Sequence, residues 1–575
     1  MSISTIVKSI QDIMRKDAGV DGDAQRLGQM AWLLFLRIFD EQELDLEAES
    51  NDYQPALPAK LRWGAWAATT ITDPDTGEEK QNPKTGEALL TFVNDTLFPT
   101  LKSLPATREK NPRGFVVKKV MEDSYNYMKN GTLLRAVINK LNELELESLD
   151  DRHAFGDFYE TLLKDLQSAG NAGEFYTPRS VTEFMVQMTN PKLGERVIDP
   201  ACGTGGFLTC TIEHVNRHEV KGDATAHRTL QRQIFGVEKK PLPHLLCTTN
   251  MFFHGIEVPD QIMRDNTLAR KRDYWKPTER FDVVLTNPPF GGMEEDGIEK
   301  NFHDDMQTRE TADLFLQLIV HILKDKGRAA LVLPDGTLFG EGVKAKIKEM
   351  LLRDCNLHTV VRLPNSVFAP YTSIKTNLLF LEKGEPTRDI WYYEMQLPPG
   401  VKAYNKTRPL RVEEFAACAA WWGGAQREGR VENAQAWKVP FGTLKADKQS
   451  EAKPYNDEAK AQRLLVSNLA HAIKELKAEL KDADADGKAA LNTQIEQYQL
   501  EREQALEAEK QARAKADGIY WPIYNLDSPN PHVKASTLGD PDALLARHGA
   551  LQTEIEATLG QLQAVLAAAL SGKTV

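Results

Sequence analysis

The sequence lacks the marks of a membrane or secreted protein. No apolar run approaches the roughly 18 consecutive residues that a membrane-spanning helix needs. The first residues, MSISTIVKSIQDIMRKD, carry charges too early for a secretory signal and offer no small-residue cleavage site. We therefore expect a cytoplasmic protein without a membrane partner.

Cysteine is also scarce. The five cysteines are scattered and form no C-x-x-C pair, which argues against a disulfide framework and indicates a reducing compartment. His214 and His218 lie four residues apart on a predicted helix, as in a zinc pair, but no third ligand with suitable spacing is nearby. We therefore expect no metal site.

The chain has fewer basic than acidic residues. The formal net charge of −12 excludes a wholly basic nucleic-acid binder. If the chain acts on DNA, a partner or a local patch must hold most of the phosphates. One basic triplet, Arg270-Lys271-Arg272, could touch phosphate, although a single triplet is more often an ordinary solvated loop.

The chain is too long for one ordinary core, and its patterns change along its length. Residues 1–165 predict an N-terminal helical domain, interrupted by a loop-rich insertion near residues 70–87. Residues 166–400 alternate short apolar runs with helical segments such as 313–327, which predicts an α/β domain with a mainly parallel, doubly wound sheet. The predicted strands are 195–199, 234–238, 281–286, 328–333, 358–363 and 376–382, and the last two follow too closely for a helix, which allows an antiparallel ending.

The remaining residues are mostly helix formers. Residues 401–454 are a mixed connecting region, and residues 455–516 predict two long charged helices in a hairpin. A further helix is expected from about 540 to 570. Such helices can be a solvated arm, but a two-helix arm buries little by itself, so we interpret 455–575 as a region of long helices for partner docking.

The strongest motif is ERVIDPACGTGGFL, in which a strand ends at Asp199 and a glycine-rich loop leads into a helix. Glycines let the backbone approach a ligand, and the helix N-terminus offers free N–H groups. The loop fits NAD, FAD or S-adenosylmethionine. Gly203 and Gly205 should not tolerate bulk, and Cys202 is expected to be a small space-filler and not a nucleophile.

Two further elements follow in the same predicted sheet. The next strand ends at Glu238, whose carboxylate can accept hydrogen bonds from two ribose hydroxyls. Later, the strand FDVVL runs directly into the motif Asn287-Pro288-Pro289-Phe290. Ligands in open α/β sheets bind at the carboxyl ends of the strands, where all of these motifs lie.

With these motifs the sequence resembles a class I S-adenosylmethionine-dependent methyltransferase that acts on an amino nitrogen. The segment Glu174-Phe175-Tyr176-Thr177-Pro178-Arg179 precedes the glycine loop, with Thr177 predicted as a helix N-cap and Pro178 as the first helical residue. The chain most closely resembles the modification (M) subunit of type I restriction-modification systems, through LLFLRIFDEQE, FGDFYETLLKDLQSAGNAGEFYTPR, DPACGTGGFL, GVEKKPLPHLLCTTNM, DNTL and NPPFGG. This resemblance covers residues 1 to about 385.

The resemblance implies a fold, a cofactor and a reaction. The fold is a Rossmann-like sheet with an N-terminal all-helical domain and a C-terminal helical region, and the reaction is methyl transfer from S-adenosyl-L-methionine to adenine N6 in DNA. Asn287 and Pro288 would accept the two N–H hydrogens of a flipped adenine and Phe290 would stack on it, with Pro289 completing the motif. The implied cofactor-binding residues are Glu174, Phe175, Tyr176, Thr177, Pro178, Arg179, Asp199, Cys202, Gly203, Thr204, Gly205, Glu238, Asp265 and Asn266.

The third-strand motif departs from the family. The family commonly has Gly-Asp-Thr-Leu, whereas this chain has Arg264-Asp265-Asn266-Thr267-Leu268. Either Asp265 or Asn266 could therefore meet the cofactor adenine.

The resemblance also implies partners. Two M subunits would join one specificity (S) subunit that reads double-stranded DNA, and a motor-nuclease (R) subunit would complete the complex. The acidic charge of this chain agrees with delegated DNA reading.

Two other functions remain open from the sequence. The Asn-Pro-Pro-aromatic motif also serves enzymes that methylate glutamine in proteins or guanine in RNA. A non-catalytic assembly scaffold could keep the same fold, although the intact Asn287, Pro288 and Phe290 argue against it.

Overall fold

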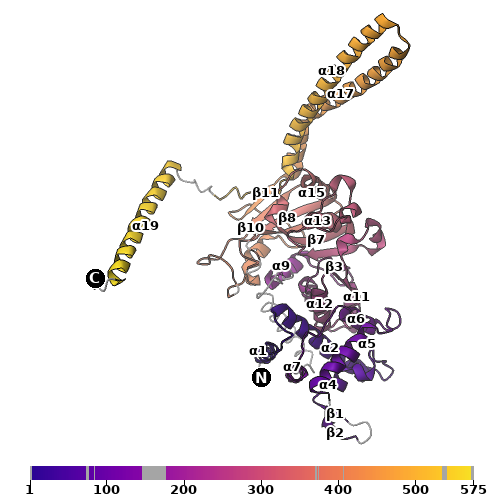
Figure 1. Ribbon diagram of the computed structural model, residues 1–575, viewed down its shortest axis with the longest axis vertical. Coiled ribbons are helices and arrows are strands. Elements are labelled where there is room, and N and C mark those ends of the chain that lie inside the picture. The colour runs from indigo at the N-terminus through magenta and orange to yellow at the C-terminus, as the bar shows by residue number, and fades with distance from the viewer. Residues whose placement is uncertain are drawn as a thin grey trace.

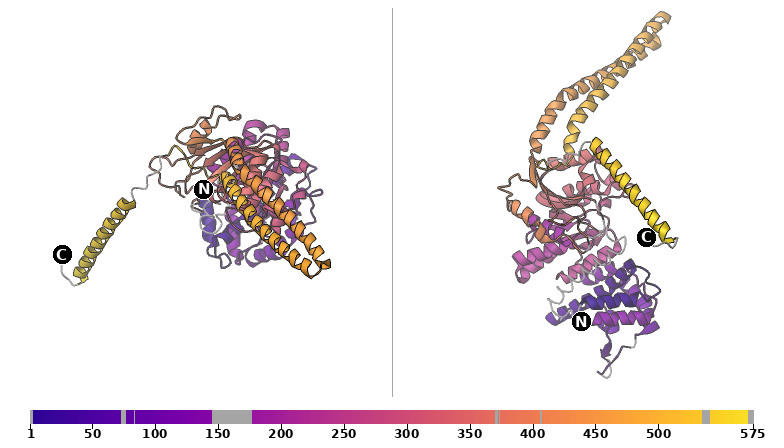
Figure 2. Two further views of the ribbon diagram at one scale, coloured as in Figure 1. Left: turned by 90° about the horizontal axis from the view of Figure 1, so that it is seen from above. Right: turned by 90° about the vertical axis from the view of Figure 1, so that its left-hand side faces the viewer.

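The computed structural model describes residues 3–72, 77–82, 84–144, 177–369, 372, 374–405, 407–533 and 541–570. Helices of the N-terminal domain lie at one end, a sheet domain lies in the middle, and a long helical hairpin projects from the other end (Figure 1). The C-terminal helix, α19, is seen apart from this body in Figure 1 and in the left view of Figure 2. Among the described residues, no helix is both long and apolar enough to cross a membrane.

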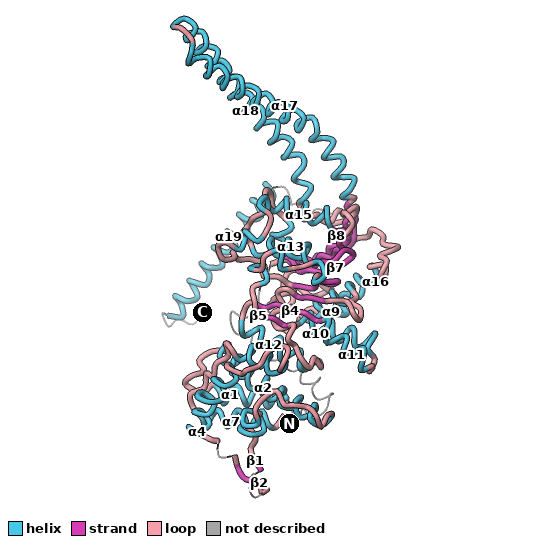
Figure 3. The backbone as a smooth tube through the Cα atoms, turned by 90° about the vertical axis from the view of Figure 1, so that its right-hand side faces the viewer, coloured by secondary structure: helices cyan, strands magenta, loops and turns pink. Residues whose placement is uncertain are grey.

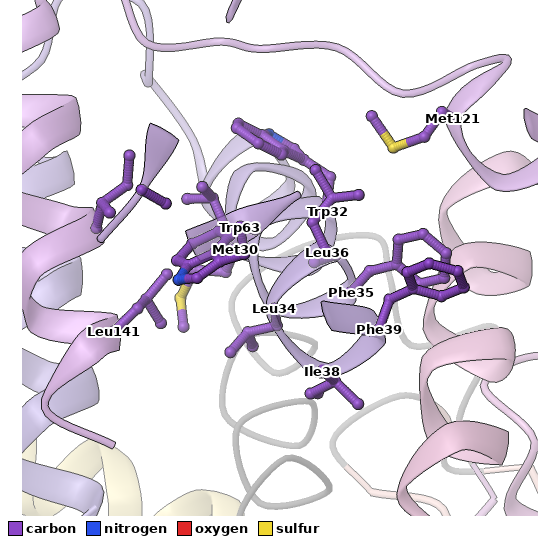
Figure 4. Close-up of a cluster of buried hydrophobic side chains, with 14 of the residues drawn as sticks. Met30, Trp32, Leu34, Phe35, Leu36, Ile38, Phe39, Trp63, Met121 and Leu141 are labelled. Carbon is purple, nitrogen blue, oxygen red and sulfur yellow. The ribbon is translucent and has the colours of Figure 1, made fainter. Parts of the chain in front are cut away.

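The N-terminal domain is built around α2, which is apolar on nearly all sides. Trp32, Phe35 and Phe39 on this helix are fully buried, and the surrounding helices cover them (Figure 4). The insertion near residues 70–87 contains a short antiparallel pair, β1 with β2, where the sequence predicted only loop. The elements are α1 (Ile3–Met14), α2 (Asp23–Glu49), η1 (Ala59–Leu61), α3 (Trp63–Trp66), β1 (Thr70–Thr72), β2 (Glu79–Gln81), α4 (Gly86–Thr91), η2 (Phe92–Leu97), α5 (Phe98–Lys102), α6 (Pro112–Met121) and α7 (Gly131–Asn142).

The sheet has nine strands in the order β11-β10-β8-β9-β7-β6-β3-β4-β5. Strands β7, β6, β3, β4 and β5 are parallel to one another. Strand β9 is antiparallel to both β7 and β8, so the predicted antiparallel pairing of the last two predicted strands is confirmed. Figure 3 shows the strands stacked through the centre of the domain, with helices around them. The strands are β3 (Val197–Asp199), β4 (Ile234–Glu238), β5 (Ile262–Arg264), β6 (Phe281–Thr286), β7 (Leu323–Pro334), β8 (Cys355–Arg362), β9 (Thr376–Lys383), β10 (Ile390–Glu394) and β11 (Ala436–Val439).

The helices of the sheet domain connect and cover these strands. The α-helices are α9 (Arg179–Thr189), α10 (Gly206–Val215), α11 (Ala224–Gln233), α12 (Pro241–Phe253), α13 (Thr311–Ile322), α14 (Asp335–Leu338), α15 (Val343–Asp354) and α16 (Ala416–Trp421). The short turns are η4 (Asn216–Val220), η5 (Thr267–Ala269), η6 (Arg272–Tyr274), η7 (Pro277–Glu279), η8 (Ile298–Asn301), η9 (Asp304–Met306) and η10 (Val412–Phe415).

Two predictions for this domain are wrong in extent. The helix expected over 313–327 ends at Ile322, because β7 begins at Leu323. The sheet does not end near residue 400, because β11 lies within the predicted connecting region and pairs antiparallel with β10.

The helical domain is fixed to the sheet domain through α12. Phe252 on α12 packs against Phe35 and Phe39, with ring centroids 5.7 Å and 5.9 Å apart, and lies in the same hydrophobic core. Gln42 also donates a hydrogen bond to the carbonyl of Phe252 at 3.0 Å. Because α12 directly follows β4, the helical domain is anchored beside the strand that ends at Glu238.

The C-terminal helices form the predicted hairpin, but with different limits. Helix α17 (Phe441–Asp482) begins inside the predicted connecting region, and α18 (Ala485–Tyr520) returns beside it. The chain then re-enters the sheet domain through η11 (Trp521–Tyr524), where Ile523, Tyr524 and Leu526 join the hydrophobic core. Residues 455–575 are therefore not a single separable region, and only α19 (Pro541–Leu570) follows this return.

Candidate functional site

A cavity of about 940 Å³ opens at the carboxyl ends of β3, β4 and β6. It brings together motifs that are more than 100 residues apart in the sequence. The predicted site residues that line it are Thr177, Arg179, Asp199, Cys202, Gly203, Thr204, Glu238, Asp265, Asn266, Asn287, Pro288, Pro289 and Phe290.

Asp199 stands at the end of β3 and is almost completely buried. Its Oδ1 accepts hydrogen bonds from the Ala201 N–H at 3.0 Å and from the Thr286 hydroxyl at 2.7 Å. Burial raises the pKa of Asp199 to about 7, against the effect of these hydrogen bonds. The cavity therefore contains a carboxyl group whose ionised form a cationic ligand would stabilise.

Glu238 stands at the end of the neighbouring strand, β4, and holds the glycine loop in place. Its Oε2 accepts a hydrogen bond from the Gly203 N–H at 3.0 Å, and its Oε1 accepts one from the Lys240 N–H at 2.7 Å. Burial raises the pKa of Glu238 as well. Each oxygen keeps a lone pair that can accept a hydroxyl hydrogen from a ligand in the cavity.

Cys202 is buried within the glycine loop. A hydrogen bond with Cys247 and burial raise the pKa of its thiol well above the ordinary value, so it is not a thiolate nucleophile at neutral pH. This agrees with the space-filling role predicted for it.

Asn287 follows β6, and only the nitrogen of its side-chain amide is hydrogen-bonded to another described residue. Its Nδ2 donates a hydrogen bond to the Thr177 hydroxyl at 3.0 Å. Its Oδ1 is buried, and no described residue donates a hydrogen bond to it. A buried amide oxygen without a donor costs free energy, so Asn287 offers an acceptor for a ligand N–H in the cavity.

Thr177 does not have the capping role predicted for it. Helix α9 begins at Arg179, its N-cap position is Pro178, and no side chain caps it. The Thr177 hydroxyl instead accepts the hydrogen bond from Asn287. The Thr177 hydroxyl therefore bonds to a side chain that is distant in the sequence and not to the backbone of α9.

Phe290 is partly buried and forms an aromatic wall of the cavity. Its ring lies edge-to-face with that of Phe368, with centroids 5.5 Å apart and an interplanar angle of 76°. Pro288 is buried whereas Pro289 is exposed. A planar ring that enters the cavity can therefore meet an aromatic face beside the amide of Asn287.

Comparison with known proteins identifies the family that this geometry belongs to. Residues 150–462 match the N-6 DNA methylase family, and residues 3–141 match the HsdM N-terminal domain family. The chain belongs to the N-6 DNA methylase family.

Full-length relatives are methylase subunits of type I restriction enzymes. The chain is 53% identical to the EcoEI methylase subunit of Escherichia coli, covering 100% of this chain and 99% of that one. A solved chain from work on complex assembly and conformational transition of the type I R-M system is 33% identical, with a TM-score of 0.68, and 100% of this chain and 99% of that one are covered. A modification subunit from Vibrio vulnificus YJ016 is 42% identical, with a TM-score of 0.66, over 77% of this chain and 92% of that one.

The predicted family, fold class and reaction are thereby confirmed. This N-6 DNA methylase is an adenine-specific DNA methyltransferase of the type I modification subunits, with an N-terminal helical domain, a central mixed sheet and a C-terminal helical region. The protein-glutamine, RNA-guanine and scaffold alternatives are set aside.

Part of the segment predicted to precede the glycine loop lies outside the described residues, namely Glu174, Phe175 and Tyr176. Arg179 is described, and its guanidinium bonds to α10 by donating to the Thr209 hydroxyl at 3.0 Å and pairing with Glu213. The start of α9 is thus tied to the helix that follows the glycine loop.

Gly205 occupies a different position from the one predicted for it. It does not line the cavity, and a Cβ added to it would lie 2.8 Å from Cys247 Sγ and 3.4 Å from Met251 Cε on α12. Its φ of +89° also lies in the left-handed region. Gly205 is therefore needed for close packing of the loop on α12, and its place among the cofactor-binding residues remains a prediction.

The structure predicts that Gly205→Ala destabilises the protein more than Gly222→Ala does. Gly222 has nearly the same φ, +87°, but nothing lies within 4 Å of a Cβ added to it, so both variants share the backbone strain and only the first has the clash. We expect the free energy of unfolding to fall by about 1 kcal/mol or more in Gly205→Ala beyond the loss in Gly222→Ala, as measured by urea denaturation. Equal losses would show that packing against Cys247 is unimportant.

Asp265 and Asn266 both lie at the cavity, but their side chains are differently engaged. The Asp265 carboxylate accepts hydrogen bonds from the Arg270 guanidinium at 2.8 Å and from the Asn266 N–H at 2.8 Å. The Asn266 amide caps the turn η5 and donates to Glu294 at 3.0 Å. Both remain proposals as contacts of the cofactor adenine.

Two polar groups complete the description of the site. Asn250 was not singled out in the sequence; it lines the cavity from α12 and donates to the Thr204 carbonyl at 2.8 Å, which fixes the loop. His214 bonds to Asn190 at 2.9 Å, and the described residues contain no group of side chains that could hold a metal ion. The signal for Asn250 was only its position in the motif CTTNM on an apolar helix.

Proposed function

We propose that the cavity binds S-adenosylmethionine together with one adenine extruded from double-stranded DNA, and that Asn287 presents the N6 amino group for methylation. The observation that carries this proposal is the buried Oδ1 of Asn287, to which no described residue donates a hydrogen bond. The exocyclic amino group of adenine supplies N–H donors of the kind this oxygen lacks.

The chemistry of the cavity fits the cofactor. Asp199 offers an acceptor for the methionine ammonium group, Glu238 offers acceptors for the ribose hydroxyls, and the Gly203 backbone allows a close approach. Either Asp265 or Asn266 contacts the adenine ring. Bound S-adenosylmethionine supplies an electrophilic methyl group. The other proposed cofactor-binding residues are Glu174, Phe175, Tyr176, Thr177, Pro178, Arg179, Cys202 and Thr204.

Asn287 and Pro288 are proposed to activate the target nitrogen. The lone pair of adenine N6 is delocalised into the ring, so the amino group is a poor nucleophile. When the Asn287 Oδ1 and the Pro288 carbonyl accept its two N–H hydrogens, the nitrogen is drawn toward tetrahedral geometry and its lone pair is exposed for in-line attack. Thr177 positions this amide by accepting the Nδ2 hydrogen bond, and Phe290 stacks on the base.

Sequence reading and further assembly are proposed to come from partners. An S subunit would select the DNA site for two copies of this chain, and a motor-nuclease R subunit would join the full complex. The net charge of −12 supports delegated DNA binding, and the reaction on DNA supports a cytoplasmic location.

The test is incubation of the chain with S-adenosylmethionine labelled in the methyl group, in the presence and absence of the S subunit. Label should enter N6-methyladenine in duplex DNA that contains the recognition site, and only when the S subunit is present. Label in protein or RNA, or none in DNA with the S subunit present, would contradict the proposal.

The affinity for S-adenosylmethionine should depend on pH through Asp199. With a pKa of about 7, Asp199 is mostly protonated below pH 7 and must lose that proton before it pairs with the ammonium group. The affinity should therefore fall by up to about tenfold for each pH unit below 7. It should stop rising near pH 8, where the ammonium group of the ligand begins to lose its own proton. Calorimetric titrations between about pH 6 and about pH 8 measure this dependence.

Asp199→Asn is the control, since it keeps the shape of the side chain but cannot titrate. Its affinity should be lower than that of the wild type and nearly constant over the same range. An unchanged pH dependence in this variant would show that Asp199 is not the group responsible.

A further inference from the structure

A second cavity, of about 280 Å³, lies at the edge of the sheet opposite the methyltransferase site. Arg280, directly before the first residue of β6, lines this cavity, whereas Asn287, directly after the last residue of β6, lines the first one. Helix α13 spans the same distance, with Thr311 in the first cavity and His321 in the second. The second cavity is therefore separated from the target base by the length of a strand.

The second cavity has a strong excess of positive charge. No carboxylate among the described residues forms a salt bridge with Arg272, Arg280 or Lys383, while Arg270 pairs with Asp265 and Arg353 with Asp354. Lys383 donates hydrogen bonds to the carbonyls of Val320 and Leu323, and Arg272 bonds to His303, but neither contact neutralises the positive charge. The ionisable lining residues are Arg270, Arg272, Arg280, Arg353, Lys383, His303, His321 and the single acid Asp354.

Three buried N–H donors at this cavity have no acceptor among the described residues. They are the indole Nε1 of Trp275, the Nε of Arg280 and one terminal nitrogen of Arg270. Trp275 is only 5% exposed, so its N–H is withdrawn from solvent. Buried donors without acceptors cost free energy, which a ligand with several acceptor oxygens would recover.

The cations at this cavity also destabilise one another. Burial and the nearby Arg280 lower the pKa of Lys383. Burial lowers the pKa of His321, and the charges of Arg272, Arg280 and Lys383 lower it further. A bound anion would relieve this repulsion.

We propose that the second cavity binds a phosphate-bearing anion from solution, of pyrophosphate to mononucleotide size. Guanidinium groups match phosphoryl oxygens in geometry and charge, and the cavity presents several of them together. Phe302 adds a partly buried aromatic ring that suits a nucleotide base. A cavity of about 280 Å³ can enclose a small phosphate-bearing molecule but not the sugar-phosphate backbone of a DNA duplex.

The test is titration of the full chain with inorganic pyrophosphate and, separately, with ADP. Binding of either should weaken about tenfold or more in Arg272→Ala/Arg280→Ala, because charge-assisted hydrogen bonds are lost. Arg388→Ala is the matched control, since this arginine is 82% exposed and outside the cavity, and it should bind as the wild type does. Tighter binding of ADP than of pyrophosphate would identify a nucleotide, and equal binding would identify the phosphates alone.

Trp275→Phe tests the site without a change of charge. It removes the indole N–H and should weaken pyrophosphate binding by a smaller factor, while unchanged S-adenosylmethionine affinity shows that the fold is intact. The proposal is overturned if the wild type binds neither anion, or if the double arginine variant binds them normally. Binding of a short duplex that depends on these arginines, with no binding of either small anion, would assign the cavity to the DNA backbone and also overturn it.

Discussion

Replacing Asn287 with alanine should abolish methyl transfer while leaving the affinity for S-adenosylmethionine nearly unchanged. The variant removes the buried Oδ1 that is proposed to accept an adenine N–H, whereas Asp199 and Glu238, the proposed cofactor contacts, are untouched. Loss of one preorganised polar contact at a reacting group typically costs about 100-fold or more in rate. Single-turnover methylation with the S subunit and calorimetry with the cofactor measure the two quantities separately.

Thr177→Val provides a graded companion to this variant. It removes the hydroxyl that accepts the Asn287 Nδ2 hydrogen bond at 3.0 Å, so the amide is present but less firmly oriented. Methyl transfer should fall by less than in Asn287→Ala, because the Asn287 amide is still present. If cofactor affinity is lost in step with activity in Asn287→Ala, the role assigned to Asn287 is wrong.

Removing the helical hairpin while keeping both of its ends should separate partner assembly from cofactor binding. Lys515 lies over the ring of Tyr455, 5.8 Å from its centroid, so a short linker can replace residues 456–514. The shortened chain should keep the fold and bind S-adenosylmethionine normally, but should assemble poorly with the S subunit and so lose methylation of specific DNA. Co-purification and a cofactor titration measure the two effects.

Truncation of the whole chain from residue 455 is a contrasting variant. A docking region over 455–575 that is separate from the sheet domain would allow this deletion without loss of the fold, but the removed residues include part of the sheet-domain core. Tyr524 bonds to Glu349 at 3.1 Å, Leu526 accepts a hydrogen bond from Tyr392 at 3.0 Å, and both lie in the sheet core. We expect this truncation to unfold the sheet domain.

A deletion that starts at residue 534 keeps these contacts and removes α19. Helix α19 exposes Leu551, Ile555, Leu559 and Leu562 at helical spacing, so its loss should also weaken S-subunit assembly without affecting the fold. Undiminished assembly in both the hairpin deletion and the α19 deletion would contradict a docking role for the C-terminal helices.

Local patterns predicted the central strands well because their apolar runs are bounded by turn residues. The runs 234–238 and 281–286 coincide with β4 and β6. The end of α13 was predicted too late, because LKDKG continues the helical pattern, whereas Leu323 pairs with Phe281 of β6 and the helix ends before it. Strand β11 was not predicted, because its four residues gain their structure from β10, more than 40 residues earlier.

Most of the residues that line the cavity could be predicted because their motifs depend on local backbone chemistry, but the residues that they contact could not. Cys247, which leaves no room for a Cβ on Gly205, is 42 residues away in the sequence. The contact that a side chain at position 205 would make could therefore not be inferred from the sequence. The same holds for Thr177, which meets Asn287 across 110 residues. The sequence WPIYNLDSP looks like a loop after a charged helix, and its anchoring depends on residues such as Glu349 and Arg362.

The two ends of the helical hairpin meet at the surface of the sheet domain, where the rings of Phe441 and Tyr524 are 5.8 Å apart. The hairpin is thus an insertion whose length is independent of the catalytic fold. Equal numbers of residues can be added to or removed from α17 and α18 without changing any contact within the sheet. Each residue added to or removed from both helices moves the turn between them by about 1.5 Å. Evolution can therefore adjust the reach of this enzyme toward differently spaced partners, and a protein engineer can do the same, without altering its chemistry.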